Sequence, residues 1–188
     1  SPQVSQVLTQ FKPESLRRYP PATAQKFRQL AAELHGLDLE NVIATRGGDE
    51  LLRLVITTFV DPGEKIGMTD PTYSLYPVLA QIQNCPIAEV PLLDNWALPD
   101  EFARSMNDAK VALTFLVNPH APTGALLPIG QVSKLASELN SILLLDEAYI
   151  DFVDHDYQTS QLVKQHDNLV ILRTLSKGYS LAGLRFGY

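Results

Sequence analysis

Hydrophobic and polar positions alternate along this chain with two periods, one typical of strands and one typical of helices. Short apolar runs predict strands at residues 42–45, 65–69, 87–90, 111–117, 142–145 and 169–173. Apolar residues at helical spacing predict helices at residues 22–35, 51–60, 73–83, 99–105 and 130–140. This regular succession predicts an α/β fold of three layers, in which helices cover both faces of a mixed but mostly parallel sheet.

We expect residues 1–188 to form one domain, because no linker, repeat or low-complexity tract interrupts the pattern. With 45% hydrophobic residues the chain can bury a substantial core. The sequence has no initiator methionine, no signal-peptide pattern at its start, and ends three residues after Arg185. We therefore expect a piece of a longer protein.

Charge and composition favour a small-molecule partner. The formal net charge of -6 and the lack of a long basic run argue against nucleic acid or an anionic membrane as the main partner. The longest apolar runs fall far short of the roughly 18 residues that span a bilayer. Cys85 is the single cysteine, so no internal disulfide forms and a reducing, cytoplasmic location is expected. The histidines lack metal-ligand spacing, which predicts no metal site.

Chemically capable residues follow several of the predicted strands. Ligands of open parallel sheets bind at the carboxyl ends of the strands. The residues expected at those ends are Gly47 and Gly48, Asn118, Asp146, and Ser176 with Lys177. Their convergence on one edge predicts a single site there.

Lys177 is the candidate nucleophile of this site. A lysine amine forms a Schiff base with an aldehyde cofactor such as pyridoxal phosphate. The Ser176 hydroxyl and the Arg185 guanidinium can bind a phosphate, and Thr174 lies beside them in the sequence. Taken alone, the Ser-Lys pair is more often a solvated loop and Arg185 a surface ion-pair partner, but their combination favours the cofactor.

Asp146 follows four apolar residues and should emerge from a buried strand. A carboxylate in such a place needs a positive partner, and a protonated pyridine nitrogen supplies one. Tyr149 could then hydrogen-bond the phenolic oxygen of the same ring. Four hydrophobic residues before Asp-Glu also match a Walker B pattern, but no P-loop motif occurs in the chain, which disfavours a nucleotide triphosphatase.

Gly47, Gly48 and Asp49 stand at a predicted helix start, where backbone N–H groups and the helix dipole favour a phosphate. A plain turn would give the same glycine pair. Tyr73 could place its ring over the face of a cofactor, although an aromatic residue at a helix start is more often part of a core.

Motifs along nearly the whole chain resemble one family. They are Arg18-Tyr-Pro20, Thr45-Arg-Gly-Gly-Asp-Glu50, Asp70-Pro-Thr-Tyr73, Leu93-Asp-Asn-Trp96, Pro122-Thr-Gly124, Asp146-Glu-Ala-Tyr149, Arg173-Thr-Leu-Ser-Lys177 and Ala182-Gly-Leu-Arg185. The chain resembles the large domain of the fold-type I, aspartate aminotransferase-like pyridoxal-phosphate enzymes, most closely the histidinol-phosphate aminotransferases. The resemblance implies that residues 1–188 are a cofactor-binding large domain without its N-terminal arm and C-terminal small domain.

The resemblance also implies a role for each site residue. Lys177 would form the Schiff base and move the proton, Asp146 would contact the ring nitrogen, and Tyr149 would contact the phenolic oxygen. Gly48, Asp49, Ser176 and Arg185 would surround the phosphate, with Tyr73 stacked on the ring. In the family the tyrosine that matches Tyr19 reaches the cofactor of a neighbouring subunit, which implies a homodimer.

The implied reaction is transamination between L-histidinol phosphate and 2-oxoglutarate, giving imidazole acetol phosphate and glutamate in histidine biosynthesis. An amino donor and a 2-oxo acid would be its small-molecule partners. Threonine-phosphate decarboxylases and aromatic amino-acid aminotransferases share the scaffold and remain alternatives. A non-catalytic regulatory module that keeps the same fold is a third.

One position departs from the family pattern. The family usually carries an asparagine, which hydrogen-bonds the cofactor's phenolic oxygen, where this chain has Ala121. Two hypotheses follow. Either Asn118 or His120 supplies that contact, or Tyr149 alone holds the phenolic oxygen.

Overall fold

The computed structural model describes residues 2–188, and the chain divides into two compact units, one up to Ala44 and one from Thr45 to Tyr188. The first unit contains helices α1 (Pro2–Thr9) and α2 (Gln25–His35) and the short 3-10 helices η1 (Pro13–Arg17) and η2 (Leu39–Asn41). Helix α2 ends at Gly36, in the left-handed conformation expected of a C-terminal cap. The Arg28 side chain joins α2 to the following segment by donating to the carbonyls of Leu39 and Val42.

The second unit is built on one parallel sheet. Its strands are β1 (Lys65–Asp70), β2 (Ile87–Pro91), β3 (Val111–Val117), β4 (Ile142–Asp146) and β5 (Leu169–Leu172), in the order β2-β1-β3-β4-β5. All four neighbouring pairs are parallel. Antiparallel pairing within residues 2–188 is confined to isolated bridges that Gly187 makes with Thr45 and Thr174. The predicted mostly parallel sheet is confirmed.

The sixth predicted strand, at residues 42–45, is wrong. Only Thr45 makes a bridge there, and residues 42–44 have no strand partner. Apolar residues in an extended segment become a strand only when a neighbouring strand accepts their backbone hydrogen bonds. Val42 is nevertheless buried, which explains why its segment reads as apolar.

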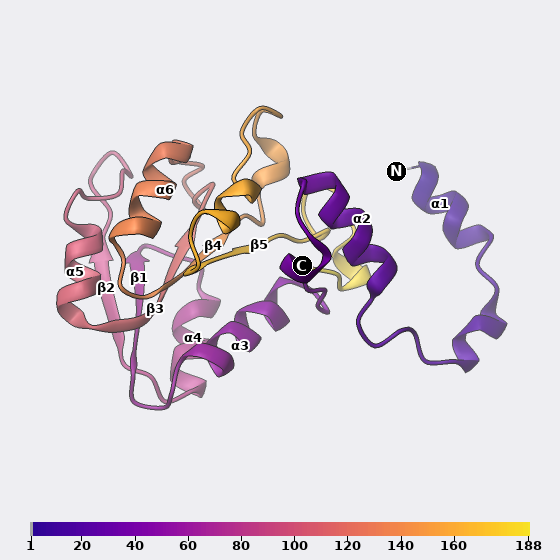
Figure 1. Ribbon diagram of the computed structural model, residues 1–188, viewed down its shortest axis with the longest axis horizontal. Helices are drawn as coiled ribbons and strands as arrows, with labels where there is room; N and C mark the ends of the chain where they lie inside the picture. Colours follow the sequence, from indigo (N-terminus) through magenta and orange to yellow (C-terminus); the bar gives the residue numbers. More distant parts are fainter. Residues whose placement is uncertain (1) are drawn as a thin grey trace. The chain divides into compact units, whose positions relative to one another are not determined.

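Helices cover both faces of the sheet, as the predicted three-layer architecture requires. Helices α3 (Gly48–Phe59) and α4 (Leu75–Ile82) lie on one side of the strands, and α5 (Phe102–Ala109) and α6 (Ile129–Glu138) lie on the other (Figure 1). Three short 3-10 helices complete the unit, namely η3 (Ile150–Phe152), η4 (Ser160–Lys164) and η5 (Ala182–Leu184). Within residues 2–188 no helix has the length and apolar character needed to cross a membrane.

All five predicted helices form, but their limits differ by up to four residues from those expected, and the starts of two of them are informative. Helix α3 already begins at Gly48, so the glycine pair forms its start and not a separate turn. Helix α5 begins three residues after Pro99, which instead accepts the Phe102 N–H in a turn. The shift lets Phe102, Ala103 and Met106 bury one face of the helix.

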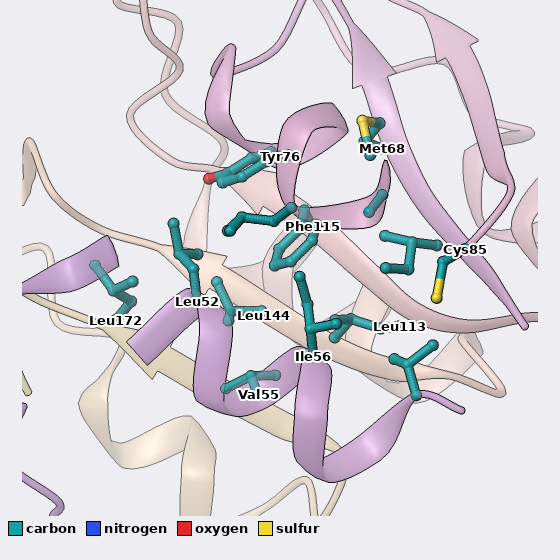
Figure 2. Packing of buried hydrophobic residues seen from close by; sticks show 14 of the residues in the cluster. Leu52, Val55, Ile56, Met68, Tyr76, Cys85, Leu113, Phe115, Leu144 and Leu172 are labelled. Atoms are coloured by element: carbon teal, nitrogen blue, oxygen red, sulfur yellow. The ribbon is translucent and has the colours of Figure 1, made fainter. Parts of the chain in front are cut away.

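The sheet separates two hydrophobic clusters, because side chains alternate along each strand. On β4, Leu144 packs with α3 and α4, whereas Leu143 and Leu145 pack with α5 and α6. Figure 2 shows the first cluster, in which Tyr76 and Phe115 lie side by side. Burial on both faces explains why the central strands are continuous apolar runs.

The strand order reverses next to β1. The chain runs from β1 outward to β2 and then returns to place β3 on the other side of β1. Ligands of doubly wound sheets bind outside the carboxyl ends of the strands where the order reverses. The topology therefore predicts a ligand site among the segments that follow β1, β3, β4 and β5.

Candidate active site

A cavity of about 190 Å³ opens at this carboxyl edge. It is lined by Gly48, Asp49, Leu52, Tyr73, Val117, Ala121, Asp146, Ala148, Tyr149, Leu172, Thr174, Ser176, Lys177, Ala182 and Arg185. Most residues that the sequence predicts for the site are therefore brought to one pocket. Their elements are far apart in the chain, and only the parallel sheet aligns their ends.

Asp146 is the last residue of β4 and forms the buried wall of the cavity. Its Oδ2 accepts a hydrogen bond of 2.7 Å from the Tyr76 hydroxyl, and its Oδ1 accepts one of 3.0 Å from the Ala148 N–H. Burial raises the pKa of the Asp146 carboxyl, although the Tyr76 hydrogen bond opposes this effect. Both donors are neutral, so the carboxylate would be stabilised by a cation placed against it.

Lys177 lies in the segment that follows β5, and its Nζ is 5.2 Å from the centroid of the Tyr149 ring. A tight turn positions it. The Thr174 hydroxyl accepts the Ser176 N–H at 3.2 Å, and the Thr174 and Ser176 hydroxyls lie 3.0 Å apart. Lys177 itself is exposed, so its amine can be reached from solvent.

The start of α3 and Arg185 form the side of the cavity suited to an anion. The first N–H groups of a helix have no acceptor within it and favour negative charge. Gly47 has φ +92, and a Cβ there would lie 2.6 Å from Arg185 Nη2, so only glycine lets the guanidinium approach this closely.

Arg185 also forms an ion pair of 3.3 Å with Asp49, in which both side chains are about half exposed at 49% and 56%. Such a pair is weak, so an anion can compete with it for the guanidinium. The Asp49 carboxylate is negatively charged and repels an anion. The backbone N–H of Asp49, in the first turn of α3, can instead donate to the anion.

Tyr73 flanks the cavity between β1 and α4, with 40% of its surface exposed. Its ring meets the Tyr76 ring edge to face, with centroids 5.5 Å apart. Burial is the main cause that raises the pKa of the Tyr73 hydroxyl, so this ring stays neutral. A neutral, half-exposed ring on a pocket wall suits a flat aromatic ligand.

The side chains of Asn118 and His120 form hydrogen bonds outside the cavity. Asn118 is fully buried: its Nδ2 donates to the Tyr157 hydroxyl at 2.7 Å, and its Oδ1 accepts the Leu127 N–H at 2.8 Å. The two ring nitrogens of His120 lie 2.9 Å from Thr123 Oγ1 and 3.0 Å from the Pro71 carbonyl. Neither residue lines the cavity, whereas Ala121 does.

Two other predicted residues do not line the cavity. Gly47 stands behind it as the residue before α3. Tyr19 belongs to the first unit and is fully exposed. Within residues 2–188 no cluster of His, Cys, Asp and Glu side chains suits a metal ion.

Sequence reasoning missed several residues that support the site. Glu147 is buried and accepts hydrogen bonds from Arg173 Nε at 2.9 Å and from the Thr159 hydroxyl. Burial raises the pKa of the Glu147 carboxyl, and the Arg173 charge opposes the rise. The sequence predicts Tyr76 only as part of a helix. Its place three residues after Tyr73 gave no sign that it would reach Asp146.

A lysine, a buried carboxylate and an anion-binding helix start share one cavity on a doubly wound sheet. Such a set of groups is what an enzyme with an amine nucleophile and a phosphorylated ligand requires. The family model for aminotransferase class I and II matches residues 2–188. The chain therefore belongs to the class I and II aminotransferases, which confirms at the level of the family the enzyme class expected from the sequence.

Similar sequences cover the whole chain. It is 40% identical over 188 residues to histidinol-phosphate aminotransferase 1 of Trichormus variabilis, covering 100% of this chain and 52% of that protein. It is 41% identical over 174 residues to the histidinol-phosphate aminotransferase of Rhodopirellula baltica, covering 92% and 47%. The chain thus spans about half the length of the curated relatives it matches.

Solved structures share the fold. A histidinol-phosphate aminotransferase from Sinorhizobium meliloti, in complex with pyridoxal-5'-phosphate, matches with a TM-score of 0.93 at 24% identity, over 100% of this chain and 52% of that one. The L-threonine-O-3-phosphate decarboxylase from Porphyromonas gingivalis matches with a TM-score of 0.78 at 22% identity, over 91% and 50%. The aspartate aminotransferase-like fold expected from the sequence is confirmed.

Proposed function

We propose that this chain is the cofactor-binding part of an enzyme that transfers an amino group from L-histidinol phosphate to 2-oxoglutarate. The products would be imidazole acetol phosphate and glutamate, and the cofactor would be pyridoxal phosphate. The observation that carries the proposal is the cavity that joins Lys177, Asp146 and the start of α3. We infer the substrate from the names of relatives that are about 40% identical to this chain.

The residues present fit pyridoxal phosphate. The cofactor carries an aldehyde, a basic ring nitrogen and a phosphate on different sides of one ring. The cavity offers the Lys177 amine, the Asp146 carboxylate and an anion-binding side that contains Ser176 and Arg185. A protonated ring nitrogen would also give Asp146 the cation that its buried carboxylate lacks.

Each residue then has a defined task. Bound pyridoxal phosphate supplies an electron-accepting ring that stabilises negative charge at the substrate carbon. The unprotonated Lys177 Nζ removes the proton from the amine-bearing carbon of the substrate and later returns it. Asp146 would keep a proton on the ring nitrogen, Tyr73 would pack on the ring, and Arg185 with the α3 N–H groups would bind the phosphate.

The contacts around Ala121 favour one of the two hypotheses for the phenolic oxygen. Both functional atoms of the Asn118 amide and both nitrogens of His120 are already hydrogen-bonded. Ala121 has no donor, and the neighbouring donor on the same cavity wall is Tyr149. We therefore propose that Tyr149 alone holds the phenolic oxygen.

We further propose that the active protein is a cytoplasmic homodimer in which Tyr19 reaches the partner subunit's cofactor phosphate. The full exposure of Tyr19 and the single cysteine of the chain support this proposal. Residues 1–188 would form a cofactor-binding large domain, completed by an N-terminal arm and a C-terminal small domain. The shared length of about half of each relative supports that extent.

The assay uses the whole enzyme loaded with pyridoxal phosphate. Histidinol phosphate and 2-oxoglutarate should react with a kcat/KM at least about tenfold above that for phenylalanine, and phosphothreonine should release no carbon dioxide. The Lys177→Ala variant should lose the visible absorbance of the bound cofactor and its fixation by borohydride. Retention of that absorbance would reject Lys177, and preference for another donor would reject the substrate.

A further inference from the structure

Within residues 2–188, Tyr76 is the one side chain whose hydroxyl donates a hydrogen bond to the Asp146 carboxylate. It lies in the first turn of α4 and is fully buried. Its ring stacks on Phe115 of β3, with centroids 4.4 Å apart and an interplanar angle of 17°. In Figure 2 the Tyr76 oxygen points away from Met68; the ring belongs to the hydrophobic core, and the hydroxyl bonds to Asp146.

The direction of this hydrogen bond is fixed by chemistry. Burial and the nearby Asp146 charge raise the pKa of the Tyr76 hydroxyl well above 10.0. Tyr76 therefore keeps its proton at any physiological pH and acts only as a donor to Asp146. A donor to a carboxylate stabilises the ionised form, and this contact is the largest influence that lowers the pKa of Asp146.

The two neutral donors also fix the orientation of the carboxyl group. The Tyr76 hydroxyl holds Oδ2 at 2.7 Å and the Ala148 N–H holds Oδ1 at 3.0 Å. Each oxygen keeps a lone pair for a further donor. The ring of Tyr76 cannot shift to release Asp146 without disturbing its stacking on Phe115.

We propose that Tyr76 is a positioning residue for the cofactor: its hydroxyl keeps the Asp146 carboxylate ionised and oriented, so that the proton shared with the ring nitrogen stays on the nitrogen. This inference rests on the proposed function. The other titratable groups that influence or face Asp146 are Asp49, Tyr73, Glu147 and Lys177. Within residues 2–188, the Asp146 side chain accepts hydrogen bonds from Tyr76 and Ala148 and from none of these four groups.

The test compares the whole wild-type enzyme with Tyr76→Phe, loaded with pyridoxal phosphate that carries nitrogen-15 in the ring. In Y76F the nitrogen-15 resonance should move toward the value of an unprotonated pyridine, because the proton shifts to Asp146. We expect kcat to fall about 10–100-fold, with KM changed less than about twofold, since the lost hydrogen bond is to a charged group. In the pH profile of kcat, the decline on the acidic side should begin at a higher pH, because Asp146 loses the hydrogen bond that lowers its pKa.

A cofactor analogue separates this role from packing. In 1-deazapyridoxal phosphate a carbon replaces the ring nitrogen, so no proton is shared with Asp146. With this analogue the wild-type and Y76F rates should agree within about twofold, because the two changes remove the same interaction. Tyr157→Phe is the matched control: it removes the half-buried hydroxyl that accepts a hydrogen bond from Asn118, and it should leave the nitrogen-15 resonance in place.

A second substitution keeps the proposal testable if Y76F does not fold. With 3-fluorotyrosine at position 76, a more acidic hydroxyl of nearly the same size should move the resonance toward the protonated value. An unchanged resonance in both substitutions would show that Tyr76 only packs, and the proposal would be wrong while the proposed function stands. A wild-type enzyme that binds no pyridoxal phosphate would overturn the proposed function as well.

Discussion

At the scale of single residues, the wall around Ala121 distinguishes this chain from the usual family pattern. Ala121 and Tyr149 line the same cavity, and the resemblance implies an asparagine at position 121 in the family. Asn118 cannot supply the missing amide, because its side chain donates to the Tyr157 hydroxyl and accepts the Leu127 N–H. The Tyr157 hydroxyl in turn donates to the Leu127 carbonyl. The Asn118 amide is therefore occupied outside the cavity, and Ala121 adds no donor to the cavity wall.

Ala121→Asn should therefore change the bound cofactor. A second donor beside the phenolic oxygen would stabilise its negative charge and lower the proton affinity of the neighbouring Schiff-base nitrogen. The pH midpoint of the visible absorbance should fall by about one unit, as expected of one hydrogen bond to a charged group. A spectrophotometric pH titration of the whole enzyme measures this midpoint.

Ala125→Asn is the control for that titration. Ala125 is half-buried in the same loop but does not line the cavity. Its substitution should leave the midpoint unchanged. If A121N also leaves it unchanged, another group already satisfies the phenolic oxygen, and the assignment to Tyr149 alone is wrong.

At the scale of secondary structure elements, a buried ion pair joins the ends of β4 and β5. Glu147 follows β4, Arg173 follows β5, and Arg173 Nη2 lies 2.8 Å from Glu147 Oε2. The Glu147 side chain is fully buried and that of Arg173 is 14% exposed. The pair therefore links the residue after Asp146 to the start of the segment that carries Lys177.

Arg173→Met should destabilise the fold by about 3–5 kcal/mol, because it leaves a buried carboxylate without its cation. The double variant Glu147→Gln, Arg173→Met should recover much of this loss. Urea unfolding measures both free energies. The loss in R173M should shrink as the pH falls through the raised pKa of Glu147, since the protonated carboxyl no longer needs a partner.

Arg104→Met provides the comparison. Arg104 and Asp108 form an exposed pair of 3.6 Å on α5, with 84% and 73% of the side chains exposed. Its loss should have little effect on the unfolding free energy, because solvent screens such pairs. Equal losses in the two variants would contradict the structural role assigned to the buried pair.

The elements themselves were largely predictable. Residues 111–117 were predicted as a strand and form β3 with the same limits, because a run buried on both faces is apolar throughout. Residues 42–45 are similar in character but lack a partner strand. Pairing depends on what lies alongside, which no local pattern contains.

At the scale of the whole molecule, the chain matches about half of each curated relative. The cavity contains Lys177, Asp146 and Arg185, which we propose bind the cofactor. Tyr19 is the exception, because the proposed role of this exposed side chain lies in a partner subunit. The oligomer is thus expected to complete the phosphate site.

Mixed dimers test this expectation. A protomer with Tyr19→Phe is combined with a protomer with Lys177→Ala, using two affinity tags to isolate the heterodimer. If Tyr19 acts on the partner's cofactor, the heterodimer has one intact site and about half of the wild-type activity per dimer. Activity no higher than that of the Y19F homodimer would place Tyr19 in its own subunit's site or outside both.

By itself, the sequence determined the alternation of strands and helices and the chemistry available at Lys177, Asp146 and Arg185. Period and side-chain type are local properties, so they can be read along one chain. Only the tertiary structure decided that Tyr76 reaches Asp146, 70 positions away, and that Asn118 bonds to Tyr157 and not into the cavity. Such contacts depend on strand order and on packing across the sheet, which place residues together regardless of their separation in sequence.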